Sequence, residues 1–396
     1  MLYRPEAFEP LADEPWDEAG VRTAIAAIVS DADEAFDPET LWPANEWDAW
    51  ESTPPLKDLY CGAGGVVWGL DALRRRGHAE THIDLAAAAA RALELQRERP
   101  DLAGLEELPT PPASSLFCGE TGTLLMAWRL APSAELADAL LERVRDNVAN
   151  EAEELMWGSP GTLVAAHVMH GWTGEERWLE AWRESAEALR SRRDANGLWT
   201  QRLYGAEPRQ IVGPAHGLVG NVHALLQGED ERDDRLGHET AAVLSREAVV
   251  EGGLANWPPV AGGPLERNDQ IRLQWCHGAP GIVTTAATYL DEELLLAGAE
   301  LTWQAGAHGA EKGAGLCHGT AGNGFALLAA FARTGDERWL ERGWRFAVHA
   351  LAQAERVRTE AGRGRYSLMT GDVGVALFAA TCLDGDARFP VLDGWD

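Results

Sequence analysis

The sequence predicts an all-α protein folded as an α/α toroid, a double ring of about seven inner and seven outer helices. Two observations support this prediction: a Gly-x-x-Gly turn recurs seven times, and longer amphipathic segments separate the turns. A repeat that extends over almost the whole chain is typical of one large domain, so residues 1–396 are expected to form a single closed unit. The turns should gather at one end of the ring, where loops held by a rigid scaffold usually carry function.

Each expected inner helix follows one of the Gly-x-x-Gly turns. The residues after each turn are small and apolar, which indicates the N-terminal part of a buried helix. Any single turn of this kind is best explained as a packing device, because glycine lets backbones approach closely. The seven turns begin at Gly62, Gly119, Gly158, Gly217, Gly278, Gly319 and Gly371.

The expected outer helices are amphipathic. Their apolar residues lie three and four positions apart, with arginine and glutamate on the other faces, as in a half-buried helix. This spacing occurs at Leu179, Trp182, Ala186 and Leu189, and again at Leu340, Trp344, Ala347 and Leu351. Residues 1–50 precede the repeats and are expected to form a helical extension that packs on the ring or closes its last gap.

Two of the seven turns carry metal-binding residue types. Cys276-His277 stands directly before Gly278, and Cys317-His318 stands directly before Gly319. Thiolate and imidazole together favour Zn²⁺ over hard cations, and a catalytic zinc keeps only three protein ligands. Cys276, Cys317 and His318 are therefore the predicted ligands of a zinc ion.

A structural interpretation competes with this one, because a free cysteine often behaves as a small buried hydrophobic residue. The doubling of the motif in neighbouring repeats favours metal binding at Cys276 and Cys317. Cys61 and Cys118 stand one place closer to their glycines and lack an adjoining histidine. We interpret these two, and Cys382, as small buried residues. A disulfide framework is not expected from five cysteines, several of which lie on motifs.

The repeated turns, together with the segments WCHGAPG from Trp275, GLCHGTAGN from Gly315 and PAHGLVG from Pro214, resemble the lanthionine synthetase C-like family. The resemblance covers roughly residues 59–383. It implies an α/α toroid and zinc-dependent addition of a thiol to dehydroalanine or dehydrobutyrine. The thiol would come from a peptide cysteine or from glutathione. The residues of the two zinc motifs are closer to those of the animal branch of the family.

The resemblance also implies roles for individual residues. Cys276, Cys317 and His318 would bind the zinc, His216 would be the acid/base residue, and Arg272 would contact the enolate. The peptide cyclases place an aspartate four residues before the third turn, where this chain has Glu154. Glu154 is longer by one methylene, and it is the candidate residue for that aspartate's share in the acid/base step.

The proposed roles fit general chemistry. Histidine has an ordinary pKa near 6.5 and can deliver a proton to Cα, and arginine is permanently charged and suits a developing negative charge. Other interpretations remain for each residue. His216 could cap nearby backbone, and Arg272 could pair with Glu266 and Asp269 in a surface ion pair. His277 and His223 could be core histidines, with His277 the better candidate for a site-lining residue.

Composition excludes some functions. The formal net charge is −29, and only two of the 34 basic residues are lysines, so no basic stripe is available to bind nucleic acid. No apolar run of about 18 residues predicts a membrane span, and no signal segment is evident at the N-terminus. A cytoplasmic location is therefore expected. The acidic loop 229–234 and the run 252–264 are expected to be exposed connections, and they could face the substrate.

Three function classes fit these observations to different degrees. The favoured class is the zinc-dependent thiol-addition enzyme. If it is a peptide cyclase, it needs a separate dehydratase partner, since none is attached. A zinc-stabilised scaffold without catalysis is the second class. The third, a carbohydrate-active toroid, would use two opposed carboxylates and would leave the Cys-His motifs unexplained.

Overall fold

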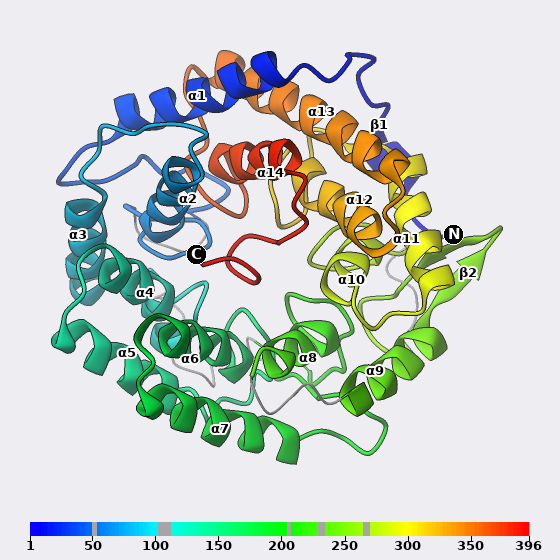
Figure 1. Cartoon of the computed structure of the whole chain (residues 1–396), viewed down its shortest axis with the longest axis horizontal. Coiled ribbons are helices and arrows are strands. Elements are labelled where there is room, and N and C mark those ends of the chain that lie inside the picture. The colour runs from blue at the N-terminus through cyan, green and yellow to red at the C-terminus, as the bar shows by residue number, and fades with distance from the viewer. Residues whose placement is uncertain (50–53, 102–111, 204–206, 229–233, 264–269, 396) are drawn as a thin grey trace.

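The computed structural model describes residues 1–49, 54–101, 112–203, 207–228, 234–263 and 270–395. Within these residues fourteen α-helices form two concentric rings (Figure 1), which confirms the predicted α/α toroid. The inner ring consists of α2 (Ala63–Arg75), α4 (Glu120–Leu130), α6 (Ser159–Thr173), α8 (Leu218–Leu226), α10 (Ala279–Thr285), α12 (Thr320–Thr334) and α14 (Asp372–Asp384). The outer ring consists of α1 (Glu18–Ala35), α3 (Leu85–Glu98), α5 (Ala134–Asp146), α7 (Glu176–Ser191), α9 (Asp234–Glu247), α11 (Glu292–Ala305) and α13 (Glu337–Ala361).

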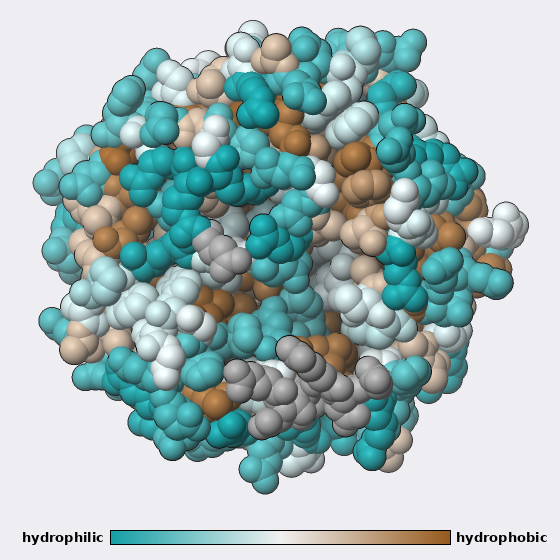
Figure 2. Space-filling view, viewed as in Figure 1, coloured by the Kyte–Doolittle hydropathy of each residue, from teal (hydrophilic) through white to brown (hydrophobic). Residues whose placement is uncertain are grey.

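Burial distinguishes the two rings, because inner helices pack on several sides and outer helices on one. Every residue of α14 from Asp372 to Cys382 is buried. In α7 the buried residues include Leu179, Trp182 and Leu189, while arginines and glutamates fill the other face. The face of the ring seen in Figure 2 is mostly hydrophilic, with hydrophobic residues scattered over it.

The second glycine of each turn is required by close packing. A Cβ on Gly281 would lie 1.7 Å from the carbonyl oxygen of Trp275, and a Cβ on Gly322 would lie 1.7 Å from that of Leu316. The same contact, to the carbonyl six residues earlier, recurs in all seven turns. Since no side chain fits there, the repeated glycines exist for packing, and the chemistry depends on the residues around them.

The segment before the repeats contributes α1 to the outer ring. This helix packs on α14 and α13, and Figure 1 shows it between α13 and α3. Its N-cap is Asp17, whose carboxylate accepts hydrogen bonds from the backbone N–H groups of Ala19 and Gly20.

Two small antiparallel sheets accompany the helices. Strand β1 (Phe8–Glu9) pairs with β4 (Ala307–His308), and β2 (Val249–Glu251) pairs with β3 (Leu254–Asn256). The β2–β3 turn is Gly252-Gly253, and both glycines have positive φ, as a two-residue hairpin requires. Two short 3₁₀ turns occur at Pro5–Ala7 and Pro112–Ser114.

The expectation that 252–264 could be a substrate-facing flap is wrong for its described part. That segment begins as the hairpin turn and continues into Asn256 and Trp257, which are fully buried. Burial of these side chains fixes the segment against the ring, and residues 252–263 do not line the cavity described below. Residues 229–233 and 264–269, which belong to the other parts of the expected loops, lie outside the described residues.

The C-terminal tail enters the space inside the ring (Figure 1). Its Phe389 is buried and stacks on Trp275, with ring centroids 4.3 Å apart and an interplanar angle of 5°. Phe389 also packs edge-on against Phe325 of α12. Because Trp275 directly precedes Cys276, the tail supports the loop that carries one of the predicted ligands.

Within the described residues, no helix has both the length and the apolar character needed to cross a membrane.

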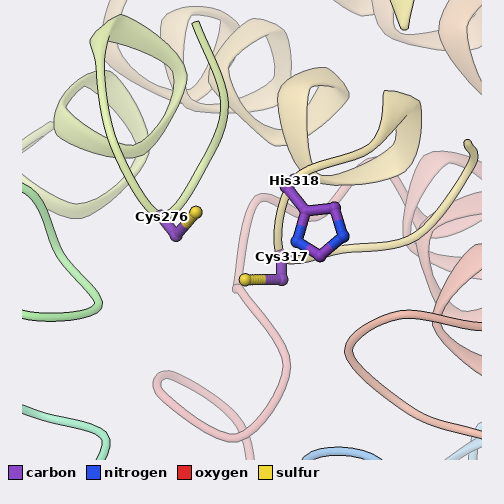
Figure 3. Close-up of side chains that lie close together, drawn as sticks. All are labelled: Cys276, Cys317 and His318. Atoms are coloured by element: carbon purple, nitrogen blue, oxygen red, sulfur yellow. The ribbon is translucent and has the colours of Figure 1, made fainter. Parts of the chain in front are cut away.

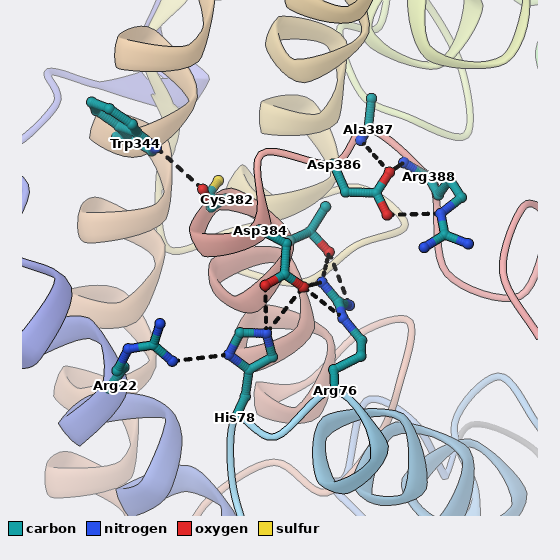
Figure 4. A network of polar contacts seen from close by, with 10 residues as sticks. Arg22, Arg76, His78, Trp344, Cys382, Asp384, Asp386, Ala387 and Arg388 are labelled. Carbon is teal, nitrogen blue, oxygen red and sulfur yellow. Dashed lines mark hydrogen bonds and ion pairs between the residues drawn. The ribbon is translucent and has the colours of Figure 1, made fainter. Parts of the chain in front are cut away.

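An ion-pair network joins the first and last inner helices (Figure 4). Arg76, just after α2, donates to the Asp384 carboxylate at the end of α14 from Nε at 3.0 Å and from Nη2 at 2.7 Å. The Nε2 atom of His78 lies 3.0 Å from the same carboxylate. Burial opposes ionisation of Asp384, but these partners outweigh it and lower its pKa. The ring is thus closed by charge as well as by packing.

We expect Asp384→Asn to lower the free energy of unfolding by about 1 kcal/mol at pH 7, a modest value because the carboxylate is 38% exposed. A lowered native pKa stabilises the fold above the unfolded value of 3.8, and the contribution is lost as the pH falls through the native pKa. Urea unfolding of wild type and variant should therefore differ at pH 7 and converge in acid. Asp386→Asn, which removes a local pair with Arg388, is the matched control. An equal loss in both variants would contradict the closure role.

Candidate functional site

A cavity of ≈ 920 Å³ opens at the end of the ring where the inner helices begin. Five of the six predicted site residues lie on its wall: His216, Arg272, Cys276, Cys317 and His318. The sixth, Glu154, lies behind His216. The prediction that the turns gather at one end of the ring therefore accounts for residues from four different repeats meeting in one place.

Backbone hydrogen bonds connect the loops around this cavity. The residue two places before the first glycine donates its N–H to the carbonyl oxygen of the corresponding residue in the next repeat. Cys276 donates to Cys317 at 2.9 Å, and Cys317 donates to Met369 at 2.7 Å. The series continues from Met369 to Tyr60 at 3.1 Å and from Tyr60 to Phe117 at 3.0 Å. Cys276 and Cys317 are thus held together by a hydrogen bond between their own backbones. This explains why the two turns that carry Cys-His occur in neighbouring repeats.

Cys276, Cys317 and His318 form a cluster whose ligand atoms all lie within 4.8 Å of one another (Figure 3). Cys276 comes from the loop before α10, and the other two come from the loop before α12. Both thiols are buried, and the imidazole is half-buried. Two sulfur atoms and one imidazole nitrogen form a donor set that suits zinc, and the cavity lies open beside it.

The surroundings of Cys276 favour its thiolate. A hydrogen bond from the Cys317 thiol lowers the pKa of Cys276 to about 7, although burial acts in the opposite direction. The side-chain amide of Gln274 donates to the Cys276 sulfur at 2.9 Å and has the same effect. A sulfur that already accepts hydrogen bonds is prepared to bind a cation.

His216 and Glu154 form a buried pair on the other side of the cavity. Nδ1 of His216 lies 2.7 Å from Oε2 of Glu154, and Glu154 is fully buried. Burial lowers the pKa of His216, but the hydrogen bond and the negative charge of Glu154 outweigh it, so the pKa lies above 6.5. Glu154 is thus a buried partner of His216 and not a surface residue. The hydrogen bond described for His216 is to Glu154, and not to the backbone of the turn.

Glu154 also has a structural role that recurs in other repeats. Its carboxylate accepts hydrogen bonds from the backbone N–H groups of Met156 and Trp157. At the same place in their own repeats, Asp58 accepts from backbone N–H groups and Ser115 accepts from that of Cys118. A polar residue four places before the first glycine thus stabilises the turn, and contact with His216 is what Glu154 adds.

A buried glutamine links the two loops that carry this pair. Nε2 of Gln201 donates to the carbonyl oxygen of Glu153 at 3.0 Å, and its Oε1 accepts from the N–H of Ile211 at 2.7 Å. Asn221 donates to the same Glu153 carbonyl at 2.8 Å. Glu153 has a φ of 50°, a conformation that costs free energy and needs such support. These contacts fix the backbone on which Glu154 and His216 are mounted.

Arg272 lies on the cavity wall with its side chain exposed. Its carbonyl oxygen accepts a hydrogen bond from Asn256 at 3.1 Å, which holds the loop before α10. The predicted alternative partners, Glu266 and Asp269, lie outside the described residues.

The two other histidines considered from the sequence, His277 and His223, lie in different parts of the molecule. His277 lines the cavity, is 9% exposed, and has an Nδ1 atom with no hydrogen-bond partner among the described residues. Its ring centroid lies 5.8 Å from that of His216. His223 lies elsewhere, beside Leu392 and Asp393 of the C-terminal tail. Only His277 therefore belongs to the candidate site.

The interpretation of Cys61 and Cys118 as small buried residues is wrong, since both are half-buried and line the cavity. The loops that precede α2 and α4 end at the same rim as the other turns, which exposes these thiols on one side. Cys382 is buried in α14 as expected. All five cysteines are free, in agreement with the prediction of no disulfide framework.

Sequence reasoning missed Gln274, Gln201 and Asp48. Gln274 had a detectable signal, because it occupies the same place before its turn as Glu154 does. Gln201 and Asp48 lie outside the turns, and their contacts join segments far apart in the chain. Asp48 lines the cavity and pairs with Arg365.

The carboxylates on the cavity wall are engaged in structural contacts. Asp48 pairs with Arg365, Glu311 pairs with Arg4, Asp58 accepts two backbone N–H bonds, and Asp372 accepts from the backbone of Arg365 at 3.2 Å. Such engaged groups do not resemble the opposed acid and base of a glycosidase.

Comparisons with known proteins identify the family of this chain. The family model described as "Lanthionine synthetase C-like protein" matches residues 53–393. "Glutathione S-transferase LANCL1" from Danio rerio is 26% identical over 308 residues, which is 70% of this chain and 74% of that protein. "LanC-like protein GCL1" from Arabidopsis thaliana is 28% identical over 203 residues, 48% of this chain and 44% of that protein.

A solved structure, "Nisin cyclase", superposes with a TM-score of 0.59 at 15% identity and covers 92% of this chain and 94% of its own. At this identity the likeness shows the shared fold. The family model covers most of the chain, including every turn of the ring and all six predicted site residues. The chain therefore belongs to the lanthionine synthetase C-like family.

Proposed function

We propose that this protein catalyses the zinc-dependent addition of a thiol to dehydroalanine or dehydrobutyrine, giving a thioether. The observation that supports this most is the convergence of the Cys276, Cys317 and His318 cluster with the His216–Glu154 pair on one cavity. One side of the cavity suits a thiolate, and the other side suits a proton donor.

Zinc is the metal that this donor set fits best. Cys276, Cys317 and His318 would hold it, and the bound ion would supply a thiolate of the substrate at a fixed place near neutral pH. Gln274 supports the site by its hydrogen bond to the Cys276 sulfur.

The remaining residues act on the dehydroamino acid. Attack of sulfur on the β-carbon places negative charge on the carbonyl oxygen, and Arg272, a cation on the wall, would stabilise it. His216 would then deliver a proton to Cα, because its raised pKa keeps it protonated at higher pH than an ordinary histidine. Glu154 orients the ring through Nδ1, which leaves Nε2 available.

The relatives support two sources for the thiol. One is named as a glutathione S-transferase, and the solved neighbour is named as a cyclase of nisin. A peptide substrate would need dehydration by a separate enzyme before it reaches this site. Five free thiols also fit a reducing compartment such as the cytoplasm.

The test is to supply the zinc-loaded protein with glutathione and a dehydroalanine-containing peptide, and in parallel with a dehydrated peptide that carries its own cysteine. Mass spectrometry should show thioether formation faster than in a control without protein. Bound zinc without acceleration in either assay would favour the alternative, a zinc-binding scaffold without catalysis.

We expect Gln201→Leu to lower kcat about tenfold without loss of zinc, because the variant releases the backbone on which Glu154 and His216 are mounted. Its pH profile should also shift toward acid as the hydrogen bond to His216 weakens. Gln210→Leu is the matched control, since the Gln210 amide bonds to Asp194 and Asn196 outside the site. A Gln201 variant that is less stable but keeps the wild-type pH profile would show that this glutamine has a structural role alone.

A further inference from the structure

Two exposed hydrophobic side chains line the cavity. Four large hydrophobic residues are exposed in the described part of the chain: Met1, Trp47, Val250 and Val357. Two of them, Trp47 at 84% and Val357 at 45% exposed, line the same cavity as the thiol cluster. Single exposed hydrophobic residues are ordinary, but two on one cavity rim of an acidic, hydrophilic protein call for a binding explanation.

Trp47 is exposed and yet lies on an anchored segment. The side chain of the next residue, Asp48, is only 4% exposed and accepts hydrogen bonds from Nε of Arg365 at 2.7 Å and from Thr370 at 2.8 Å. The N–H of Trp47 itself donates to the Asn45 side chain at 3.0 Å. The backbone position of the indole is therefore fixed at the rim, so contact with a ligand there costs little ordering entropy.

Val357 reaches the rim from the outer ring. Helix α13 has 25 residues, and its side chains at Gln353, Ala354 and Val357 face the cavity at three- and four-residue spacing. Gln353 and Ala354 are buried, and Val357 is the exposed end of this face. This face of α13 therefore extends from the inside of the cavity to its mouth.

Size and charge point to the kind of ligand. At ≈ 920 Å³ the cavity is near the upper end of the roughly 300–1,000 Å³ range of small-molecule sites, so it holds more than a thiol and one dehydroamino acid. The net charge of −29 repels anions at long range and disfavours an acidic acceptor.

We propose that Trp47 and Val357 form an apolar rim that binds an apolar side chain of the acceptor, next to its dehydroamino acid in a peptide. This inference rests on the proposed function and names the acceptor that the site prefers. The rim selects the acceptor and takes no part in bond formation.

The test uses three acceptors with one thiol: a dehydroalanine peptide with leucine beside the dehydro residue, the same peptide with aspartate there, and N-acetyl-dehydroalanine amide. We expect Trp47→Ala to raise KM for the leucine peptide about tenfold, with kcat and zinc content unchanged, as expected from loss of an aromatic contact. Val357→Ser should have a smaller effect of the same kind. Val250→Ser, which changes another exposed valine on β2 away from the cavity, is the matched control.

Binding can be measured without turnover. A peptide with leucine beside an alanine that replaces dehydroalanine should bind wild type in calorimetry and bind Trp47→Ala about tenfold more weakly. Equal KM for all three acceptors in the wild type, or the same loss with the small amide, would overturn the rim. Absence of turnover with every acceptor would instead overturn the proposed function. In that case, peptide binding that still depends on Trp47 would support the apolar rim independently of catalysis.

Discussion

Replacing Cys276 and Cys317 together by alanine is expected to reduce bound zinc from about one ion per chain to none and to abolish thiol addition. The two sulfur atoms are two of the three donors in the only cluster of its kind within the described residues. His318 alone cannot hold the ion, because a single imidazole gives weak binding. Metal analysis after dialysis against a mild chelator is the measurement.

The same variant should remain folded. The inner helices are buried on several sides by a large apolar core, so this fold does not depend on metal as a zinc finger does. Circular dichroism should show wild-type helix content. Cys382→Ala, which removes a buried cysteine within α14, is the control for thiol loss and should keep its zinc. Stoichiometric zinc in the double variant would remove the ligand assignment.

The ring itself could be predicted from sequence because its cause is local and repeated. Each turn needs a glycine where a carbonyl oxygen approaches the helix, so the same packing requirement produces a recognisable glycine pattern seven times in the sequence. The meeting of Cys276 with Cys317 follows from the same repeat, since equivalent residues are joined by backbone hydrogen bonds.

Contacts that the repeat does not determine could not be predicted. The repeat brings the loops of Glu154 and His216 to one end of the ring, but it does not specify the hydrogen bond between these side chains, which are 62 residues apart in the chain. Asp48 and Arg365 are 317 residues apart. Nothing in either segment specifies the other, because a hydrogen bond between distant side chains leaves no periodic pattern. The exposure of Cys61 and Cys118 was missed for a similar reason: the cavity wall is formed by the ends of several loops, and one loop alone does not reveal it.

The His216→Asn variant is expected to lower the rate of thioether formation by roughly 10²- to 10⁴-fold while zinc stays bound. Asparagine keeps a hydrogen-bonding side chain at the cavity wall but cannot deliver a proton to Cα. Single-turnover measurement with a dehydroalanine peptide and glutathione, together with metal analysis, separates this loss from loss of the metal. An unchanged rate would assign proton delivery to another group.

The pH dependence tests whether Glu154 acts through His216. A general acid works in its protonated form, so the wild-type rate should fall as the pH rises through the raised pKa of His216. Glu154→Gln removes the charge that raises this pKa, while burial and Arg272 continue to lower it and Cys276 continues to raise it. The fall should therefore move to lower pH, and at pH values above both midpoints the rate should be roughly tenfold lower for each pH unit that the midpoint moves.

Glu153→Gln is the matched control for that experiment, because Glu153 is also buried but pairs with Arg192, away from His216. It should leave the pH profile in place. If Glu154→Gln lowers the rate equally at all pH values, the glutamate serves the turn through Met156 and Trp157 alone. If the profile shifts, the longer side chain has taken over the part that an aspartate plays in the peptide cyclases, and the added methylene lets one carboxylate stabilise its own turn and hold the proton donor of a neighbouring repeat.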